Sequence, residues 1–489
     1  MRIAILSSEG VPFAKAGGLG DVAGALPHAL KDHRIEAVLI LPLHRQINRQ
    51  DIQERFSDSL EVEWQGQSFQ VIVYKTTITG TETYFIDAPP FFDRPGIYGY
   101  EDDHERYAFF SHAGIALLKL LGKTAPAFDV LHCNDWPGGF AIALLSRIRQ
   151  HDNFFARTKT LFSIHNIAYQ GQFYSSALPS LGFPASSEAN LFMSNGAASA
   201  LKAGMMACDC ISTVSRRYAH EIQTPEQGYG LDWLARRRND RLVGITNGID
   251  YAYWNPETDP HIAVHYSKEN LTGKQDCKLN LLRRFGLAPD ASRPVVASIS
   301  RLVEQKGIDL IREAAGEILG TGTYFIALGS GENRYENFLQ GLHDTAPQQV
   351  GIYKGYNEPL SHIIEAGADI FLMPSLYEPC GLNQMYSMRY GTIPVVRATG
   401  GLDDTVEQFD PCDPCDPCDP SSRTGTGFKF YDYSARAMMD SLRTALYYYT
   451  DRELWLGLER RAMQVDNSWS NAARQYADLY DNIMRLNNV

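Results

Sequence analysis

The chain has 489 residues, of which 44% are hydrophobic and 21% charged, and its formal net charge at pH 7 is −12. This length predicts two domains, because one hydrophobic core rarely serves so many residues. The acidic balance argues against a general nucleic-acid binder, and no apolar stretch reaches the length of a membrane-spanning helix. Because the N-terminus resembles neither a signal peptide nor a transit peptide, we expect a cytoplasmic protein.

The first predicted strand, residues 3–6, precedes a glycine-rich segment and a helix predicted over residues 23–30. The adjacent glycines Gly17 and Gly18 leave backbone N–H groups uncovered at the positive end of the helix dipole, where phosphate binds. Lys15 adds a cation before them, and Asp21 places a carboxylate in the first turn. The segment therefore suits a diphosphate attached to a group that carries hydroxyls.

The same glycines also fit the dinucleotide-binding pattern G-x-G-x-x-G/A. That pattern places its glycines directly after the first strand and a carboxylate at the end of the second. Here a long connection separates the strand from the glycines, and the second predicted strand, residues 37–41, ends in Pro-Leu-His. An NAD-dependent enzyme is thus the weaker interpretation, and cofactor binding would test it.

Buried strand-like runs alternate with helical stretches along the chain, which is typical of doubly wound α/β sheets. The runs form two series: residues 3–6, 37–41, 71–74, 130–133, 160–164 and 210–214, and then residues 294–299, 324–328, 350–353, 370–373 and 393–396. A turn-rich stretch separates the series. We therefore predict domains at residues 1–248 and 249–460, followed by a helical segment at 461–489.

Polar residues follow several predicted strands, and ligands in such sheets bind beyond the carboxyl ends of the strands. Asp135 follows the run at 130–133, and His165 and Asn166 follow the run at 160–164. In the second series Arg301 closes a strand and Lys306 opens the next helix. Their spacing lets both cations reach one diphosphate.

The segment Lys15-Ala16-Gly17-Gly18-Leu19 resembles the Lys-x-Gly-Gly-Leu signature of bacterial glycogen synthases and plant starch synthases, with Ala16 where that family usually has Thr or Val. Five further segments match the same family in order and cover most of the chain. The resemblance implies the GT-B architecture, in which two Rossmann-like doubly wound α/β domains face a deep cleft. It also implies that the helical segment at 461–489 crosses back to the first domain. It implies transfer of glucose from ADP-glucose, with UDP-glucose as the second candidate, to the non-reducing end of an α-1,4-glucan with retention of configuration.

The resemblance also implies roles for individual residues. Asp135 would lie near the acceptor hydroxyl or the glucose, the main-chain carbonyl of His165 would accept a hydrogen bond from the glucose 6-hydroxyl, and Glu378 would bind the distant glucose hydroxyls. The catalytic set it implies is His165, Glu378, Asp135, Arg301 and Lys306. The substrate-binding set is Lys15, Gly17, Gly18, Asp21, Tyr98, Asn166, Tyr356, Cys380, Gly381, Leu382 and Asn383. The family often has Thr at the position of Asn383, so the side-chain contact there departs from the pattern.

No Asp-x-Asp sequence occurs in the chain, so we expect neither a metal ion nor another cofactor. The charge of the leaving group would be neutralised by cationic side chains and helix dipoles. None of the motifs clearly supplies a carboxylate nucleophile, which favours attack on the same face as the departing diphosphate. A tandem Asp-Pro-Cys repeat at residues 410–420 is interpreted as a surface loop rather than a metal site, because its prolines forbid helix.

Two further alternatives remain beside the NAD enzyme. One is a sucrose-forming transferase with fructose as acceptor, and the other is a catalytically silent glucan-binding paralogue. The cationic and carboxylate positions that a silent paralogue could have lost are all present: Lys15, Asp21, Arg301, Lys306 and Glu378. The sequence leaves open the nucleotide base, the kind of glucan product and the oligomeric state.

Overall fold

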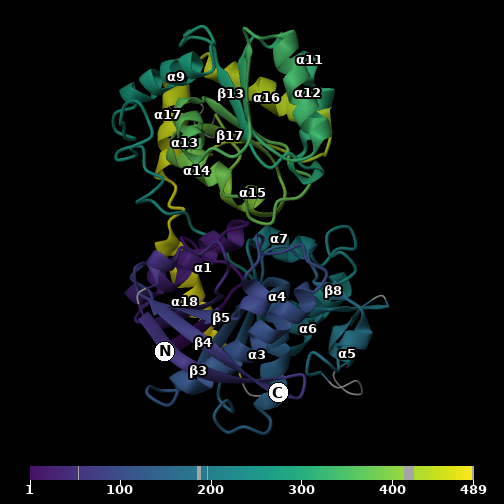
Figure 1. Ribbon diagram of the computed structural model, residues 1–489. Helices are drawn as coiled ribbons and strands as arrows, with labels where there is room; N and C mark the ends of the chain where they lie inside the picture. Colours follow the sequence, from purple (N-terminus) through teal and green to yellow (C-terminus); the bar gives the residue numbers. More distant parts are fainter. Residues whose placement is uncertain (53, 184–188, 195, 412–422, 487–489) are drawn as a thin grey trace. The chain divides into compact units, whose positions relative to one another are not determined.

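The computed structural model describes residues 1–52, 54–183, 189–194, 196–411 and 423–486. It divides into two compact units, Met1–Gly248 with Trp469–Val489 (unit 1) and Ile249–Ser468 (unit 2), both drawn in Figure 1. The segment 461–489 predicted to cross back is thus divided between the units. From residue 412 onward, the Asp-Pro-Cys repeat predicted to form a surface loop lies outside the described residues. None of the described helices combines the length and the apolar character that crossing a membrane requires.

Unit 1 contains, within its described residues, a nine-stranded sheet in the order β12-β11-β7-β6-β1-β2-β5-β4-β3. The strands from β12 to β5 are parallel, whereas β4 and β3 extend the sheet in antiparallel fashion. The strands are β1 (Arg2–Leu6), β2 (Glu36–Pro42), β3 (Glu54–Trp64), β4 (Gln67–Thr76), β5 (Thr83–Asp87), β6 (Val130–Asn134), β7 (Lys159–Ile164), β11 (Cys210–Thr213) and β12 (Leu242–Gly244). The central strands are buried along their whole length, as expected of a parallel sheet covered on both faces.

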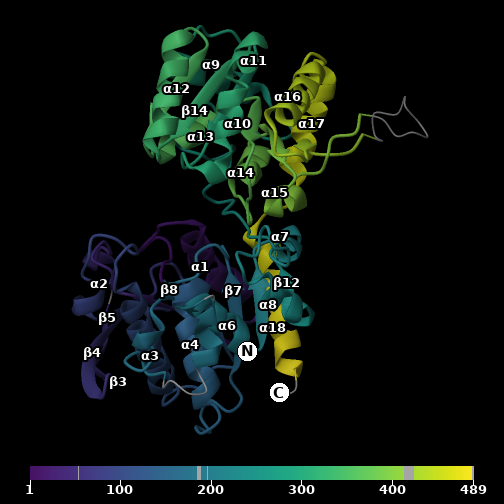
Figure 2. The same cartoon turned by 90° about the vertical axis from the view of Figure 1, so that its right-hand side faces the viewer.

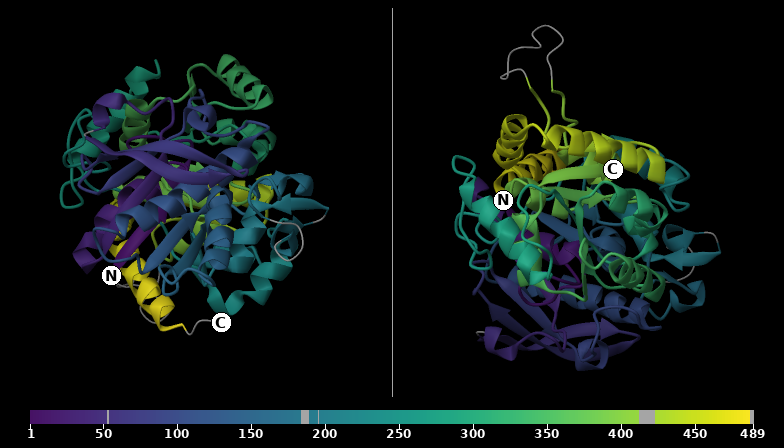
Figure 3. Two further views of the ribbon diagram at one scale, coloured as in Figure 1. Left: turned by 60° about the horizontal axis from the view of Figure 1, so that its bottom comes forward. Right: turned by 90° about the horizontal axis from the view of Figure 1, so that it is seen from above.

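Helices cover both faces of this sheet (Figure 3). Ile5 and Leu161 point to the face that α1 and α18 cover, whereas Leu6 and Phe162 point to α3 and α6 on the other face. The helices are α1 (Gly18–Ala29), α2 (Pro89–Phe92), α3 (Asp103–Leu121), α4 (Asp135–Ile148), α5 (Ala189–Phe192), α6 (Ala200–Ala207), α7 (Arg216–Glu221), α8 (Asp232–Arg237) and α18 (Trp469–Arg485). A small antiparallel sheet lies beside them: β8 (Gln172–Phe173), β9 (Met193–Ser194) and β10 (Ala197–Ser199).

Helix α18 brings residues from far along the chain into the core of unit 1. Its apolar residues recur every three or four positions, so that they form one stripe along the helix. The stripe packs into the same hydrophobic cluster as α1 and the central strands. The Tyr480 hydroxyl hydrogen-bonds His132 Nδ1 on β6 at 2.8 Å, and Lys159 Nζ donates to the Leu486 carbonyl at 2.8 Å. The core of unit 1 is therefore complete only with this helix in place.

Unit 2 contains, in its described part, a six-stranded parallel sheet in the order β15-β14-β13-β16-β17-β18. The strands are β13 (Val295–Ile299), β14 (Tyr324–Gly329), β15 (Val350–Lys354), β16 (Ile370–Met373), β17 (Ile393–Arg397) and β18 (Phe428–Phe430). The helices are α9 (Thr272–Arg284), α10 (Ile308–Glu313), α11 (Ala315–Gly320), α12 (Asn333–Thr345), α13 (Glu358–Gly367), α14 (Asn383–Arg389), α15 (Gly400–Thr405), α16 (Ala435–Tyr449) and α17 (Arg452–Gln464). Helices α9 and α13 pack on one face of the sheet, and α16 and α17 lie side by side (Figure 2).

The two ends of unit 2 are held together. The Ile249 amide donates to the Asn467 carbonyl at 2.8 Å, and Ile249 pairs with Ser468 in a parallel bridge. The Tyr251 hydroxyl also donates to the Val465 carbonyl at 2.9 Å. The chain therefore enters and leaves unit 2 through adjacent segments.

Each of the two large sheets has a topological switch point, where ligands of open α/β sheets bind. In unit 1 strand β1 lies between β2 and β6, and in unit 2 strand β13 lies between β14 and β16. In unit 1 the chain forms β2 on one side of β1 and later returns to form β6 on the other side. In unit 2 it forms β14 on one side of β13 and later forms β16 on the other. The carboxyl ends of β1, β6 and β7, and of β13 and β16, are thus where a site is expected in each unit.

Candidate functional site

Asp135 and His165 meet at the switch point of unit 1. Asp135 follows β6 directly and adopts a left-handed backbone with φ of 50°, which is uncommon for a residue other than glycine and often marks a functional position. Its Oδ1 atom accepts the main-chain N–H of His165 at 2.7 Å. This bond fixes the peptide that precedes His165. The Asp135 carboxylate also accepts the Asn166 amide, which belongs to the same peptide as the His165 carbonyl and so orients that carbonyl.

The His165 ring is held by a second buried contact. The Asn134 side-chain nitrogen donates to the Leu6 carbonyl at 3.3 Å, which leaves its oxygen toward His165 Nε2 at 3.0 Å. Burial lowers the pKa of the His165 ring to about 4, so the ring is neutral and donates through Nε2. The side-chain oxygen of Asn166 accepts the Ala168 amide at 3.0 Å and stabilises the turn that follows.

The acidity of Asp135 is set mainly by its burial. Burial raises the pKa of the Asp135 carboxyl to about 7, and the nearby Glu9 carboxylate also raises it. Hydrogen bonds from the amides of His165 and Asn166 act in the opposite direction. Asp135 therefore changes its charge near neutral pH.

The two glycines at the start of α1 have no structural need to be glycine. Gly17 has an extended backbone, with φ of −152° and ψ of −167°, and Gly18 is the first residue of α1. A Cβ atom added to either residue would meet no other atom within 4 Å. Because neither conformation nor packing requires glycine here, the missing side chains leave room for a ligand to approach the backbone.

The loop before α1 is organised by a residue that the sequence reasoning missed. One oxygen of the buried Glu9 carboxylate accepts the amides of Ala16 at 2.6 Å and Gly17 at 2.9 Å. The Gly17 amide, expected to be uncovered, is therefore already bonded. The Gly18 amide has no partner among the described residues. The signal was available, since Glu9 follows the end of β1 as Asp135 follows the end of β6.

The charged pair of this loop lies at its surface. Lys15 Nζ contacts Asp21 Oδ1 at 2.7 Å, and both side chains keep part of their surface exposed. An exposed pair of this kind contributes about 0–1 kcal/mol to stability, so the lysine can exchange its partner for a ligand phosphate at little cost.

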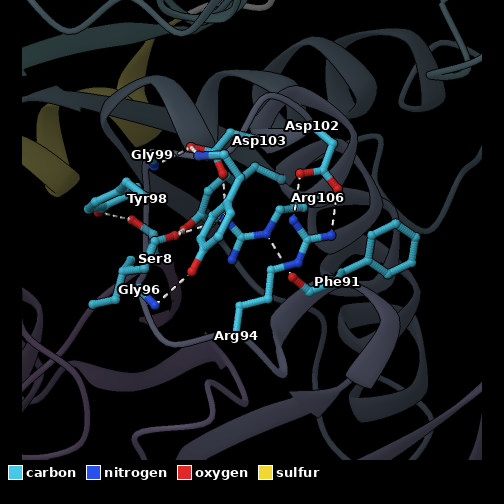
Figure 4. A network of polar contacts seen from close by, with 12 residues as sticks. Ser8, Phe91, Arg94, Gly96, Tyr98, Gly99, Asp102, Asp103 and Arg106 are labelled. Carbon is cyan, nitrogen blue, oxygen red and sulfur yellow. Dashed lines mark hydrogen bonds and ion pairs between the residues drawn. The ribbon is translucent and has the colours of Figure 1, made fainter.

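Tyr98 joins this loop to a second one. Its hydroxyl donates to the other Glu9 oxygen at 2.8 Å and lies 2.7 Å from Ser8 Oγ. Figure 4 shows how Arg106 anchors the segment that carries Tyr98. The guanidinium of Arg106 is fully buried and donates to the carbonyls of Phe91 at 2.7 Å and Ile97 at 3.0 Å. Tyr98 is therefore held at its hydroxyl by Glu9 and through the adjacent main chain by Arg106.

Trp136, next to Asp135, packs inside unit 1. Its ring lies 5.0 Å from Tyr107 in an edge-to-face arrangement, and a Cβ atom at Gly171 would collide with it. The side chain is partly buried. These contacts favour packing in the core over stacking on a sugar.

In unit 2 the structure brings two of the predicted residues into direct contact. Lys306 Nζ lies 2.5 Å from Glu378 Oε2, and the side chains are only 18% and 7% exposed. The Ser375 hydroxyl donates to the same carboxylate oxygen at 3.1 Å. The side chain of Arg301, by contrast, is exposed and has no hydrogen bond or ion pair with any residue that the structure describes. In this structure Lys306 is paired with Glu378, whereas the guanidinium of Arg301 is available to bind a ligand.

The segment after Glu378 is shaped by close backbone contacts. Gly381 has φ of 72°, and the Asn383 side-chain nitrogen donates to the Ile299 carbonyl at 2.8 Å. Asn383 thus ties the start of α14 to the end of β13. Cys380 is buried, as expected of a packed thiol, and Leu382 is partly buried directly before α14.

Tyr356 belongs to the predicted substrate-binding set. It lies between β15 and α13, and 74% of its side chain is exposed. The side chain of the following residue, Asn357, caps α13 by accepting the Leu360 amide at 3.0 Å. Tyr356 is thus presented at the end of a parallel strand on a fixed turn. Among the described residues, no group of three or more His, Cys, Asp or Glu side chains is arranged to hold a metal ion.

Two α/β units, each built on a largely parallel sheet with polar residues at its switch point, have the architecture of GT-B glycosyltransferases. Comparisons with known proteins agree. Residues 2–237 match the family model described as starch synthase catalytic domain, and residues 282–446 match that for glycosyl transferases group 1. A glycogen synthase of Koribacter versatilis is 42% identical over 98% of both chains, and that of Geobacillus stearothermophilus is 38% identical over 99% of this chain and 98% of its own.

Solved structures give the same result. The catalytic domain of starch synthase IV from Arabidopsis thaliana, bound to ADP and acarbose, has a TM-score of 0.87 and 32% identity and covers 99% of both chains. Sucrose-phosphate synthase from Thermosynechococcus elongatus, with a TM-score of 0.59, 17% identity and 98% coverage of both chains, shares the fold alone. The chain belongs to the glycogen synthase and starch synthase family, and it is a retaining glucosyltransferase.

Proposed function

We propose that this protein transfers glucose from ADP-glucose to the 4-hydroxyl at the non-reducing end of an α-1,4-glucan. The observation that carries the proposal is the open space at Gly17 and Gly18, beside Lys15 and the N-terminus of α1. Such a place accepts a diphosphate. The relative from Arabidopsis thaliana, which is similar over the full length, is bound to ADP and to the oligosaccharide acarbose, which supports both substrates.

The proposal assigns the acceptor to unit 1 and the nucleotide sugar mainly to unit 2. In unit 2, Arg301 and Lys306 would bind the diphosphate, with the amides of residues 381–383 at its distal phosphate. Glu378, oriented by Lys306, would accept hydrogen bonds from glucose hydroxyls, and the exposed Tyr356 would stack on the base. The side chain of Arg301 has no partner among the described residues, which supports its proposed role in binding the diphosphate. An exposed guanidinium can donate to two phosphate oxygens at once.

In the proposed mechanism the departing diphosphate accepts the proton of the acceptor hydroxyl on the same face of the sugar. The main-chain carbonyl of His165 stabilises the positive charge that develops on the glucose. The neutral ring of His165 supports this assignment, because the residue acts through its backbone rather than as a charged acid. Asp135 would hold that backbone and lie near the acceptor, while cationic side chains and helix dipoles would neutralise the leaving group without a metal ion.

The experiment that tests this function measures release of nucleoside diphosphate from ADP-glucose and from UDP-glucose, with glycogen as acceptor and EDTA present. We expect glycogen-dependent release that EDTA does not reduce and that is faster with ADP-glucose. Faster release from UDP-glucose would overturn the proposed donor, and loss of activity in EDTA that Mg²⁺ restores would overturn the metal-free mechanism. No release from either donor by folded protein would overturn the function itself.

A further inference from the structure

The glycine-rich loop and Tyr98 share a single buried anchor. Glu9 is 3% exposed, and its two carboxylate oxygens serve different parts of the chain. One oxygen accepts the amides of Ala16 and Gly17, and the other accepts the Tyr98 hydroxyl. No positive side chain contacts this carboxylate among the described residues, so its hydrogen bonds alone offset the cost of burying it.

The anchor continues beyond Tyr98 to a helix. Arg106 on α3 donates to the Ile97 carbonyl at 3.0 Å, and the Tyr107 hydroxyl donates to the same carbonyl at 2.7 Å. The Asp103 carboxylate pairs with Arg106 and also accepts the Gly99 amide at 2.8 Å (Figure 4). A chain of contacts thus runs from α3 through the Tyr98 segment to Glu9, and from Glu9 to the loop before α1.

We propose that Glu9 is a positioning residue of the transfer reaction, which holds the glycine-rich loop in the shape that admits the diphosphate of the donor. It binds the two amides directly before Gly18 and leaves the Gly18 amide and the space beside it for the ligand. Glu9 acts through the loop and has no contact with the reacting atoms. This inference rests on the proposed function only for the identity of the ligand.

The hydrogen-bond pattern predicts which substitution preserves the loop. In Glu9→Gln the amide oxygen can still accept the Ala16 and Gly17 amides. Its nitrogen can donate to the Tyr98 oxygen, because the Tyr98 hydroxyl can turn its proton toward Ser8 Oγ, 2.7 Å away. Glu9→Ala loses all three hydrogen bonds and leaves the loop amides without their acceptor. The hydrogen bonds that residue 9 can accept, and not its charge, should therefore determine whether the loop keeps its shape.

The first measurement is amide hydrogen exchange of residues 10–20 in the ligand-free protein. We expect the exchange of this segment to be at least tenfold faster in Glu9→Ala and unchanged within about threefold in Glu9→Gln. Glu36→Gln, which changes an exposed carboxylate paired with Arg2, is the matched control and should leave the segment unchanged. Unchanged exchange in Glu9→Ala would show that Glu9 does not hold the loop, and it would overturn the proposal.

The second measurement is ADP affinity by calorimetry, together with the KM for glycogen, well below the melting temperature of each variant. We expect Glu9→Ala to weaken ADP binding at least tenfold, with the KM for glycogen changed less than twofold, and Glu9→Gln to stay within threefold of the wild type. Wild-type ADP affinity in Glu9→Ala, or a Glu9→Gln variant as defective as Glu9→Ala, would overturn the proposal. If the wild type itself does not bind ADP but the exchange results are as expected, the proposed donor fails and the anchor stands.

Discussion

At the scale of single residues, the site is built from carboxylates and amides that hold backbone. The residue types placed directly after β6 and β7 allowed Asp135 and His165 to be predicted, because polar residues at strand ends of an α/β sheet mark a site. Their contact through a main-chain amide could not be predicted, since it depends on the left-handed backbone of Asp135. Glu9 was missed although it follows the end of β1, because the amides that it binds lie on a loop whose path the sequence does not specify.

The open space beside Gly17 and Gly18 predicts that adding a methyl group there will hinder ligand binding. Gly17→Ala and Gly18→Ala should each weaken ADP binding at least tenfold and leave the melting temperature almost unchanged, because neither glycine is needed for backbone or packing. Gly24→Ala is the contrasting variant, since its Cβ atom would lie 2.5 Å from Val11 and should cost about 1–3 kcal/mol of stability. Calorimetry and thermal unfolding measure both effects. Undiminished ADP affinity in the first two variants would show that the glycines serve another purpose.

The raised pKa of Asp135 predicts a pH dependence of stability. Burial raises this pKa from about 3.8 to about 7, so between these values the folded protein holds a proton that the unfolded chain has released. The contribution of this carboxyl to the free energy of unfolding therefore falls as the pH rises from 4 to 7. Urea unfolding should show that the wild type is more stable, relative to Asp135→Asn, at pH 5 than at pH 8, by about 1–3 kcal/mol. A difference that is independent of pH would contradict the assignment.

Removing the side chain of Lys306 and removing that of Arg301 should have different effects on stability. Lys306→Ala leaves Glu378 buried without its partner and should cost about 1–4 kcal/mol of stability, whereas Arg301→Ala, at an exposed position, should cost about 0.5 kcal/mol or less. Both should lose about 2–4 kcal/mol of transition-state stabilisation, measured as kcat/KM. Adding Glu378→Gln to Lys306→Ala should restore stability and not activity. Equal stability of the two single variants would argue against the buried pair.

At the scale of elements, apolar periodicity allowed most of the sheet to be predicted. The buried runs of β1, β2, β6, β7, β13, β14, β16 and β17 were recognised because parallel strands covered on both faces are apolar throughout. Strand β3 was missed, because its buried Leu60, Val62 and Trp64 alternate with exposed glutamates and no continuous apolar run results. The N-terminus of α1 also lies earlier than predicted, since the glycine at position 18 already belongs to the helix.

Helix α18 leads to a prediction about truncation. Removing residues 469–489 takes seven buried side chains from the core cluster of unit 1, and each large one contributes about 1.5–3 kcal/mol. The truncated protein should lose cooperative folding of unit 1, and limited proteolysis should degrade unit 1 first. The milder Tyr480→Phe, which leaves His132 Nδ1 without its partner, should cost about 1–3 kcal/mol in urea unfolding. A truncated protein that resists proteolysis as the full chain does would contradict this account.

At the scale of the whole molecule, the connectivity makes the two units unequal. Unit 1 is assembled from both ends of the chain, whereas unit 2 is continuous and its ends are bridged at Ile249 and Ser468. The sequence allowed the number of sheets and the place of the first boundary to be proposed from the turn-rich stretch. It could not fix the second boundary, because α17 and α18 both have amphipathic patterns and only their packing partners distinguish them.

This connectivity predicts that unit 2 folds alone. A fragment of residues 249–468 contains a complete parallel sheet with its helices, and its two ends pair with each other. It should therefore show the circular dichroism of an α/β protein and a cooperative thermal transition. A fragment of residues 1–248 should show neither, because it lacks α18. Cooperative unfolding of the latter fragment, or none in the former, would contradict the prediction.

The position of α18 in the core of unit 1 also orders events on the ribosome. Strand β1 emerges first, yet the stripe of α18 that covers its sheet is synthesised only after the whole of unit 2. At a synthesis rate of about 5–20 residues per second, the part of the unit 1 sheet that α18 covers stays exposed for about 10–40 s. During that interval unit 2 can fold while the nascent unit 1 still exposes apolar surface, which makes it a client for chaperones that bind such surface.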